Sequence, residues 1–137
     1  MKNKILALDV GNKRIGLAIS DELGLFAHPL YTLHRKGIER DVEEIVKIIS
    51  SHNVTDILVG LPKNMDGSSG IQVKKTYAFV DKLKEHIDNN IIFWDERLST
   101  SAARDIMLTL NIKQKNRKNI IDTIAAVVIL DDYLSNR

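Results

Sequence analysis

The chain has 137 residues and no cysteine, and its 20 Lys and Arg nearly balance its 18 Asp and Glu, leaving a net charge of +2. This length predicts a single domain over residues 1–137, and the lack of cysteine excludes disulfides, thiol catalysis and thiolate metal sites. No apolar run approaches the roughly 18 to 20 residues of a membrane-spanning helix, and the N-terminal run is too short for a secretory signal. We therefore expect a cytoplasmic protein with no membrane partner.

The first part of the chain predicts three strands. Residues 5–8 form a short apolar run that ends at Asp9, which is typical of a buried strand. Residues 15–20 follow after a turn and predict a second strand that forms a hairpin with the first. Residues 26–33 predict a third strand, and Pro29 within it favours an edge position because proline cannot donate a ladder hydrogen bond. Together these segments predict a three-strand meander.

Beyond the meander, segments with helical spacing alternate with short apolar runs. The expected order is helix 38–49, strand 56–60, helix 73–87, strand 91–94, a short helix ending at 110 and a long helix 119–134. Ser68 or Ser69 is expected to cap the second of these helices, and Ser99 or Thr100 the third. A meander followed by alternating β and α units predicts an α/β fold, a mixed five-stranded sheet with helices packed on its faces.

Acidic residues occupy three positions where a core would favour apolar ones. Asp9 ends the first strand, and Asp95-Glu96 ends the fifth, and ligands of α/β sheets usually bind at such strand ends. Strand alternation places Asp95 and Glu96 on opposite faces and does not decide between them. Asp122 heads an apolar stripe on the last helix, where the small pair 125–126 allows a close approach to the sheet.

Converging carboxylates form an all-oxygen site that suits Mg²⁺ or Mn²⁺, and two such ions can promote phosphodiester hydrolysis. A plainer interpretation is open for each acid alone, in which backbone N–H groups or a basic side chain satisfy it. The three positions together favour the metal site.

Cations cluster in three segments of the chain. Residues 11–16 lack the Walker and dinucleotide patterns, which favours a hairpin turn with left-handed glycines, and Lys13 and Arg14 are expected to project towards whatever Asp9 binds. Residues 34–36 form a second, shorter cluster. The third segment, 113–118, is expected to be a solvated loop. Beside carboxylates its cations would hold nucleic-acid phosphates; they are Lys113, Lys115, Arg117 and Lys118.

Four motifs resemble those of one bacterial family. They are DVGNKRIG (9–16), GLPKNMDGSSG (60–70), WDERLSTSAA (94–103) and NRKNIIDTIAAVVILDDYL (116–134). In this order they resemble the YqgF/RuvX family, whose members have a ribonuclease H-like fold and are related to the RuvC Holliday-junction resolvases. The resemblance extends from about residue 4 to residue 134, nearly the whole chain.

The resemblance implies a nuclease site of three acids, which map onto Asp9, Glu96 and Asp122 as catalytic residues and as ligands of Mg²⁺ or Mn²⁺. The resemblance favours Glu96 over Asp95. Arg97 joins the cations of the first and third segments as a candidate phosphate contact. Many members have Gly-Pro-Arg after the MDGS turn, where this chain has Gly-Ile-Gln, so that Lys74 or Lys75 is the nearest replacement for the arginine.

The resemblance also implies an activity, the processing of the 5′ end of pre-16S rRNA in ribosome biogenesis. One alternative is a Holliday-junction resolvase acting on four-way DNA, which would require a homodimer. Another is a non-catalytic ribosome-assembly factor that binds precursor RNA. We therefore expect an RNA partner, within an assembling ribosome or free, and a chain that is a monomer or a homodimer.

Overall fold

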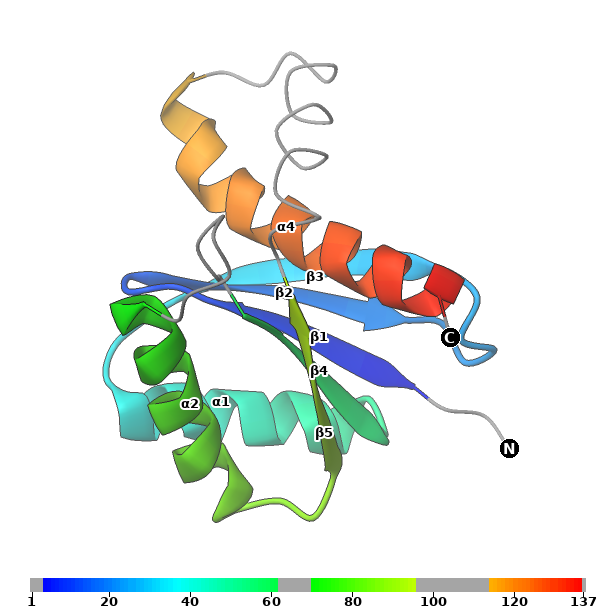
Figure 1. Cartoon of the computed structure of the whole chain (residues 1–137), viewed down its shortest axis with the longest axis horizontal. Helices are drawn as coiled ribbons and strands as arrows, with labels where there is room; N and C mark the ends of the chain where they lie inside the picture. The colour runs from blue at the N-terminus through cyan, green and yellow to red at the C-terminus, as the bar shows by residue number, and fades with distance from the viewer. Residues whose placement is uncertain (1–3, 62–69, 96–113, 137) are drawn as a thin grey trace.

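The structure is a computed structural model, and it describes residues 4–61, 70–95 and 114–136. The strands are β1 (Ile5–Val10), β2 (Arg14–Ser20), β3 (Ala27–His34), β4 (Asp56–Leu61) and β5 (Asn90–Asp95). They form one sheet in the order β3-β2-β1-β4-β5 (Figure 1). β1, β2 and β3 pair antiparallel, whereas β4 pairs parallel with β1 and with β5. This confirms the expected meander and the mixed five-stranded sheet.

Helices cover both faces of the sheet. In the described residues they are α1 (Ile38–Ser51), α2 (Ile71–Lys84) and α4 (Gln114–Asn136). α1 and α2 lie on one face, and α4 crosses the other face over β1, β2 and β3 (Figure 1). The expected short helix ending at residue 110 lies outside the described residues. None of the described helices is long and apolar enough to cross a membrane.

Strand alternation divides the core into two layers. In β1, Leu6, Leu8 and Val10 pack beneath α1 and α2, and the alternate residues Ile5 and Ala7 pack beneath α4. The layer under α4 contains small side chains from both the sheet and the helix, which brings the α4 backbone close to the strands. Asp9 continues the row of Ile5 and Ala7, and it is therefore on the α4 face.

β3 is an edge strand, as Pro29 predicts. The β2–β3 register shifts next to Ala18, the residue that is opposite Pro29. The missing N–H of proline is harmless there because one side of an edge strand has no neighbour.

The hairpin glycines are not left-handed, which corrects one expectation. Positive φ occurs in the described glycines at Gly24 and Gly37 and not at Gly11 or Gly16. The N–H of Gly11 donates to the Arg14 carbonyl at 2.8 Å, and a Cβ at Gly11 would lie 2.8 Å from that oxygen. Close backbone approach, rather than an unusual φ, requires the glycine here.

Two helix starts also differ from expectation. The N-cap of α2 is Gly70, without a side-chain cap, so the prediction of a serine cap at 68 or 69 is wrong; the helix begins at Ile71, and only the residue directly before it can cap it. α4 begins at Gln114, so most of the segment 113–118 is helical rather than a loop. Its Gln, Lys and Arg residues are good helix formers, which explains the earlier start.

Candidate functional site

A glycine brings two of the expected acids together. Asp9 is directly opposite Gly16 in the β1–β2 ladder. A Cβ at Gly16 would lie only 1.8 Å from the carbonyl oxygen of Asp122, so the α4 backbone rests on β2 at this point. Opposed residues of an antiparallel pair present their side chains to the same face at Cβ separations of about 4.5 to 5.5 Å. Asp9 and Asp122 are therefore neighbours on the α4 face.

Asp122 forms an ion pair within the site. Nε of Arg14, the first residue of β2, donates to Oδ2 of Asp122 at 2.8 Å, and the two side chains are 24% and 23% exposed. No donor in the described ranges reaches the other carboxylate oxygen, Oδ1. The plainer interpretation, an acid satisfied by a basic side chain, thus holds for one oxygen of Asp122 and, within the described residues, does not hold for the other.

The stripe that Asp122 heads packs as the spacing predicts. Ala126 and Ile129 are buried against the sheet, and Tyr133 packs edge-to-face on Trp94 with ring centroids 5.4 Å apart. Asp131, on the opposite side of the helix, is exposed. Packing of the apolar residues therefore holds Asp122 at the sheet.

Alternation along β5 separates Asp95 from the other two acids. Phe93 packs with the layer beneath α1 and α2, whereas Trp94 packs with the layer beneath α4. Asp95 therefore belongs to the face opposite Asp9. Glu96 lies outside the described residues, as does Arg97. Across the described ranges, no three acidic or histidine side chains converge closely enough to hold a metal ion.

The expected phosphate contacts lie in two places. Lys13 is exposed at the β1–β2 turn, beside the ion-paired Arg14. Lys113 lies outside the described residues. The other three cations of that segment lie on the first turns of α4, and their side chains also lie outside the described part; they are Lys115, Arg117 and Lys118.

Sequence reasoning did not connect two further cations to the β1–β2 turn. Nη1 of Arg35 donates to the Gly11 carbonyl at 2.9 Å, and Nζ of Lys75 donates to Oδ1 of Asn12 at 3.1 Å. The basic cluster 34–36 was the available signal for the first. For Lys75 the available signal was the motif after residue 70, where many family members have an arginine that this chain lacks and that Lys75 could replace.

Relatives of known sequence resemble the chain over its length. A family model described as RuvX, Holliday junction resolvase, matches residues 3–136. A protein of Desulforamulus reducens is 47% identical over 133 residues, which are 97% of each chain, and is provisionally named a pre-16S rRNA nuclease. A protein of Carboxydothermus hydrogenoformans with the same provisional name is 43% identical over 132 residues, 96% of each chain.

Solved structures resemble the fold. RuvC of Thermus thermophilus, in complex with a Holliday junction substrate, matches with a TM-score of 0.62 and 12% identity over 98% of this chain and 95% of that one. The fowlpox virus resolvase, in complex with Holliday junction DNA, matches with a TM-score of 0.57 and 12% identity over 97% of each chain. These likenesses confirm the ribonuclease H-like class. Since the family model covers nearly all residues and the relatives exceed 40% identity, the chain belongs to the RuvX family.

Proposed function

We propose that this chain is a single-domain, cytoplasmic, metal-dependent nuclease that hydrolyses phosphodiester bonds of structured RNA and processes the 5′ end of pre-16S rRNA. The observation that carries the proposal is the contact of the Asp122 backbone with Gly16, directly opposite Asp9. This contact joins two carboxylates from the first strand and the last helix at one point of the sheet. The provisional name of the relatives supports the RNA substrate.

The residues at this point fit a hard divalent cation. Carboxylate oxygens are the ligands that Mg²⁺ and Mn²⁺ prefer, and Oδ1 of Asp122 has no donor within the described residues. Asp9, Glu96 and Asp122 would hold the ion. Asp95 lies on the face opposite Asp9, which argues against Asp95 as the third ligand and leaves Glu96, the acid that the family resemblance implies. When bound, the ion supplies electrostatic stabilisation of the phosphate and acidifies a water molecule.

Arg14 balances the charge of the site before substrate arrives. Two carboxylates side by side repel each other, and the guanidinium 2.8 Å from Asp122 offsets that repulsion. The same guanidinium is next to the place where a phosphate would approach the acids. Together with Lys13, Arg97 and the cations of α4, we assign it to phosphate binding.

The test uses one substrate of each class. A 5′-extended 16S precursor RNA and a four-way DNA junction are incubated with Mn²⁺ or with EDTA, using the wild type, Asp122→Asn and Asp131→Asn. Asp131 is exposed on the far side of α4, so its variant is the matched control. We expect the wild type and Asp131→Asn to cleave the RNA only with metal, and Asp122→Asn to be inactive with an unchanged circular dichroism spectrum.

Full turnover by Asp122→Asn would remove Asp122 from the mechanism. If the wild type cleaves neither substrate but still binds RNA regardless of metal, the nuclease proposal is wrong and the protein is a ribosome-assembly factor.

The second candidate is a junction resolvase, which the description of the family model favours. Resolution requires two symmetrically placed sites, so this function needs a homodimer. Cleavage of the junction alone, by a protein that light scattering shows to be dimeric, would establish it. A monomer at the working concentration would exclude it.

A further inference from the structure

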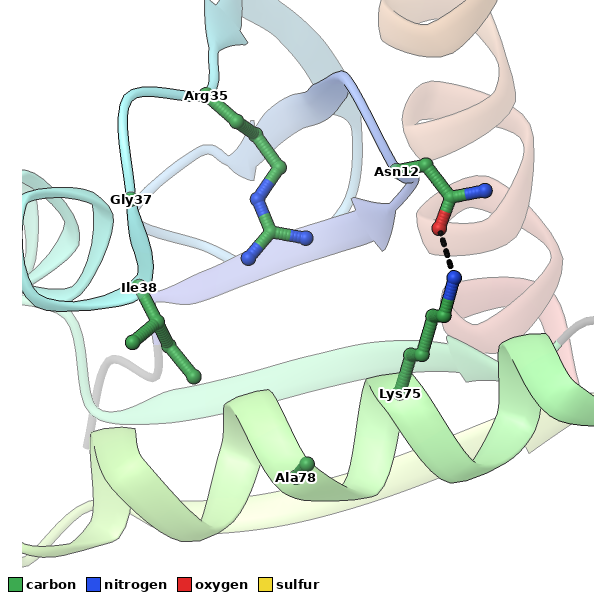
Figure 2. A pocket seen from close by; sticks show the side chains of 6 residues that line it. All are labelled: Asn12, Arg35, Gly37, Ile38, Lys75 and Ala78. Carbon is green, nitrogen blue, oxygen red and sulfur yellow. Dashed lines mark hydrogen bonds between the residues drawn. The ribbon is translucent and has the colours of Figure 1, made fainter.

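A cavity of about 510 Å³ lies at the same turn as the acids, on the side of α1 and α2. The β1–β2 turn, the turn between β3 and α1, and one face of α2 border it, and it is open to solvent (Figure 2). Its described lining residues are Asn12, Arg35, Gly37, Ile38, Lys75 and Ala78. These residues include two cations and no acid, which is the charge pattern of a site for an anion.

Arg35 is held rigidly in this cavity. Its Nε donates to Oδ2 of buried Asp41 at 3.0 Å, its Nη1 donates to the Gly11 carbonyl at 2.9 Å, and its guanidinium carbon lies 5.2 Å from the ring centre of Phe79. No acceptor in the described part of the chain binds Nη2. A guanidinium that is already ordered loses little conformational entropy when it binds a ligand through its remaining nitrogen.

Lys75 and Asn12 form the opposite wall. The hydrogen bond from Nζ of Lys75 to Oδ1 of Asn12 spans 3.1 Å and orients the amide so that its nitrogen points away from the lysine (Figure 2). The ammonium retains two further N–H donors, and the amide retains its NH₂ group. Both side chains are exposed, so a ligand can reach them from solvent.

The start of α1 also borders the cavity, through Gly37 and Ile38. Gly37 is the N-cap of α1, with φ 137° and ψ 149°, and no side-chain hydrogen bond caps the helix. A Cβ at Gly37 would meet nothing within 4 Å, so the space in front of this helix end is open. The first N–H groups of a helix and its dipole favour an anion.

We propose that this cavity binds a backbone phosphate of the nucleic-acid substrate, outside the scissile bond. The assignment rests on the proposed function, because the β1–β2 turn is shared by the cavity and the acids, and a strand that crosses the turn reaches both. Asp41 offsets the charge of Arg35, so Lys75 supplies the net positive charge, enough for about one phosphate. Free phosphate or a mononucleotide carries the same anionic group, so either is an alternative ligand that the experiment must distinguish from a nucleic-acid strand.

The experiment compares Lys75→Glu with Lys84→Glu. Both residues are exposed on α2 and the charge change is identical, but Lys84 is the last residue of the helix and does not line the cavity. Binding of fluorescent 5′-extended 16S precursor RNA is measured by anisotropy in EDTA between about 50 and 200 mM KCl. We expect Lys75→Glu to weaken binding about tenfold and to lower the salt slope by about one, and Lys84→Glu to change affinity less than about twofold.

Equal effects of the two variants would overturn the proposal, since bulk charge on α2 would then explain the binding. Inorganic phosphate and AMP are titrated in parallel by NMR. Tight binding of either that depends on Lys75, with RNA affinity unchanged, would show that the cavity holds a free phosphate and would refute the nucleic-acid assignment. EDTA allows RNA binding to be measured without cleavage. If the wild type binds RNA through Lys75 but does not cleave it when metal is added, the proposed nuclease function is refuted and the proposed phosphate site is not.

Discussion

Replacing Gly16 with alanine tests the contact on which the candidate site depends. The added Cβ would lie 1.8 Å from the Asp122 carbonyl oxygen and 2.3 Å from its carbon, where ordinary contacts begin at 3.4 Å. Both partners of this clash are backbone atoms, which cannot rotate away. α4 must therefore move from β2 by about 1.6 Å, the difference between 3.4 Å and 1.8 Å.

That movement opens the layer under α4. Ala126, Ile129 and Leu130 are buried there, and a gap of this size removes a large part of their dispersion contacts. We expect Gly16→Ala to lower the free energy of unfolding by about 3 kcal/mol. For a domain of this size the melting temperature falls by about 10 °C. Because Asp122 moves with the helix, cleavage of the precursor RNA should fall about a hundredfold.

Gly11→Ala is the matched control. It makes the same chemical change in the same hairpin, but its Cβ would lie 2.8 Å from the Arg14 carbonyl, so a much smaller movement of the turn relieves it. We expect a loss of about 1 kcal/mol. Urea unfolding followed by circular dichroism measures both variants. Stabilities that agree within error would refute the close contact between α4 and β2, and with it the reasoning that places Asp122 beside Asp9.

Three further outcomes follow from the ion pairs and from one tyrosine. Arg14→Gln should tighten Mn²⁺ binding several-fold in calorimetry, because it removes a cation that competes with the metal for Asp122. The same change should slow RNA cleavage. Weaker Mn²⁺ binding would show that the arginine does not compete with the metal. Asp41→Asn should lower the free energy of unfolding in urea by about 3 kcal/mol, since it removes the buried carboxylate that holds Arg35, and an unchanged midpoint would contradict this. Burial, the hydrogen bond to Glu44 and its charge raise the pKa of Tyr31. The stability from this group is present below pH 10.0, the ordinary pKa, and is lost as the pH rises above it; Tyr31→Phe should flatten that alkaline loss in urea titrations, and an identical loss would refute it.

Periodicity predicted the elements because each of them shows its buried face locally. Short apolar runs located the strands, helical spacing located the packing stripe of α4, and Pro29 located the edge strand. Helix starts were less accurate, since caps depend on single residues: a glycine stands where a serine was expected at α2, and α4 begins before its apolar stripe does.

The site required information that no local pattern contains. Asp9 and Asp122 stood out as acids at buried positions, but Gly16, which joins them, resembled a turn glycine because its partner is far away in sequence. Strand alternation put Asp95 and Glu96 on opposite faces, and only the assembled sheet shows that Asp95 belongs to the face opposite Asp9. The ion pair of Arg14 likewise crosses from the second strand to the last helix.

The two neighbouring acids come from the first strand and from the helix that follows all five strands, and this has a consequence for synthesis. Asp9 is translated before Asp122, which is added only after every strand of the sheet has been made. A nascent chain on the ribosome, or a product truncated before α4, therefore has only one of the pair. Since the pair is completed only when α4 docks on the sheet, we expect any activity that needs both acids to be absent from chains still being made.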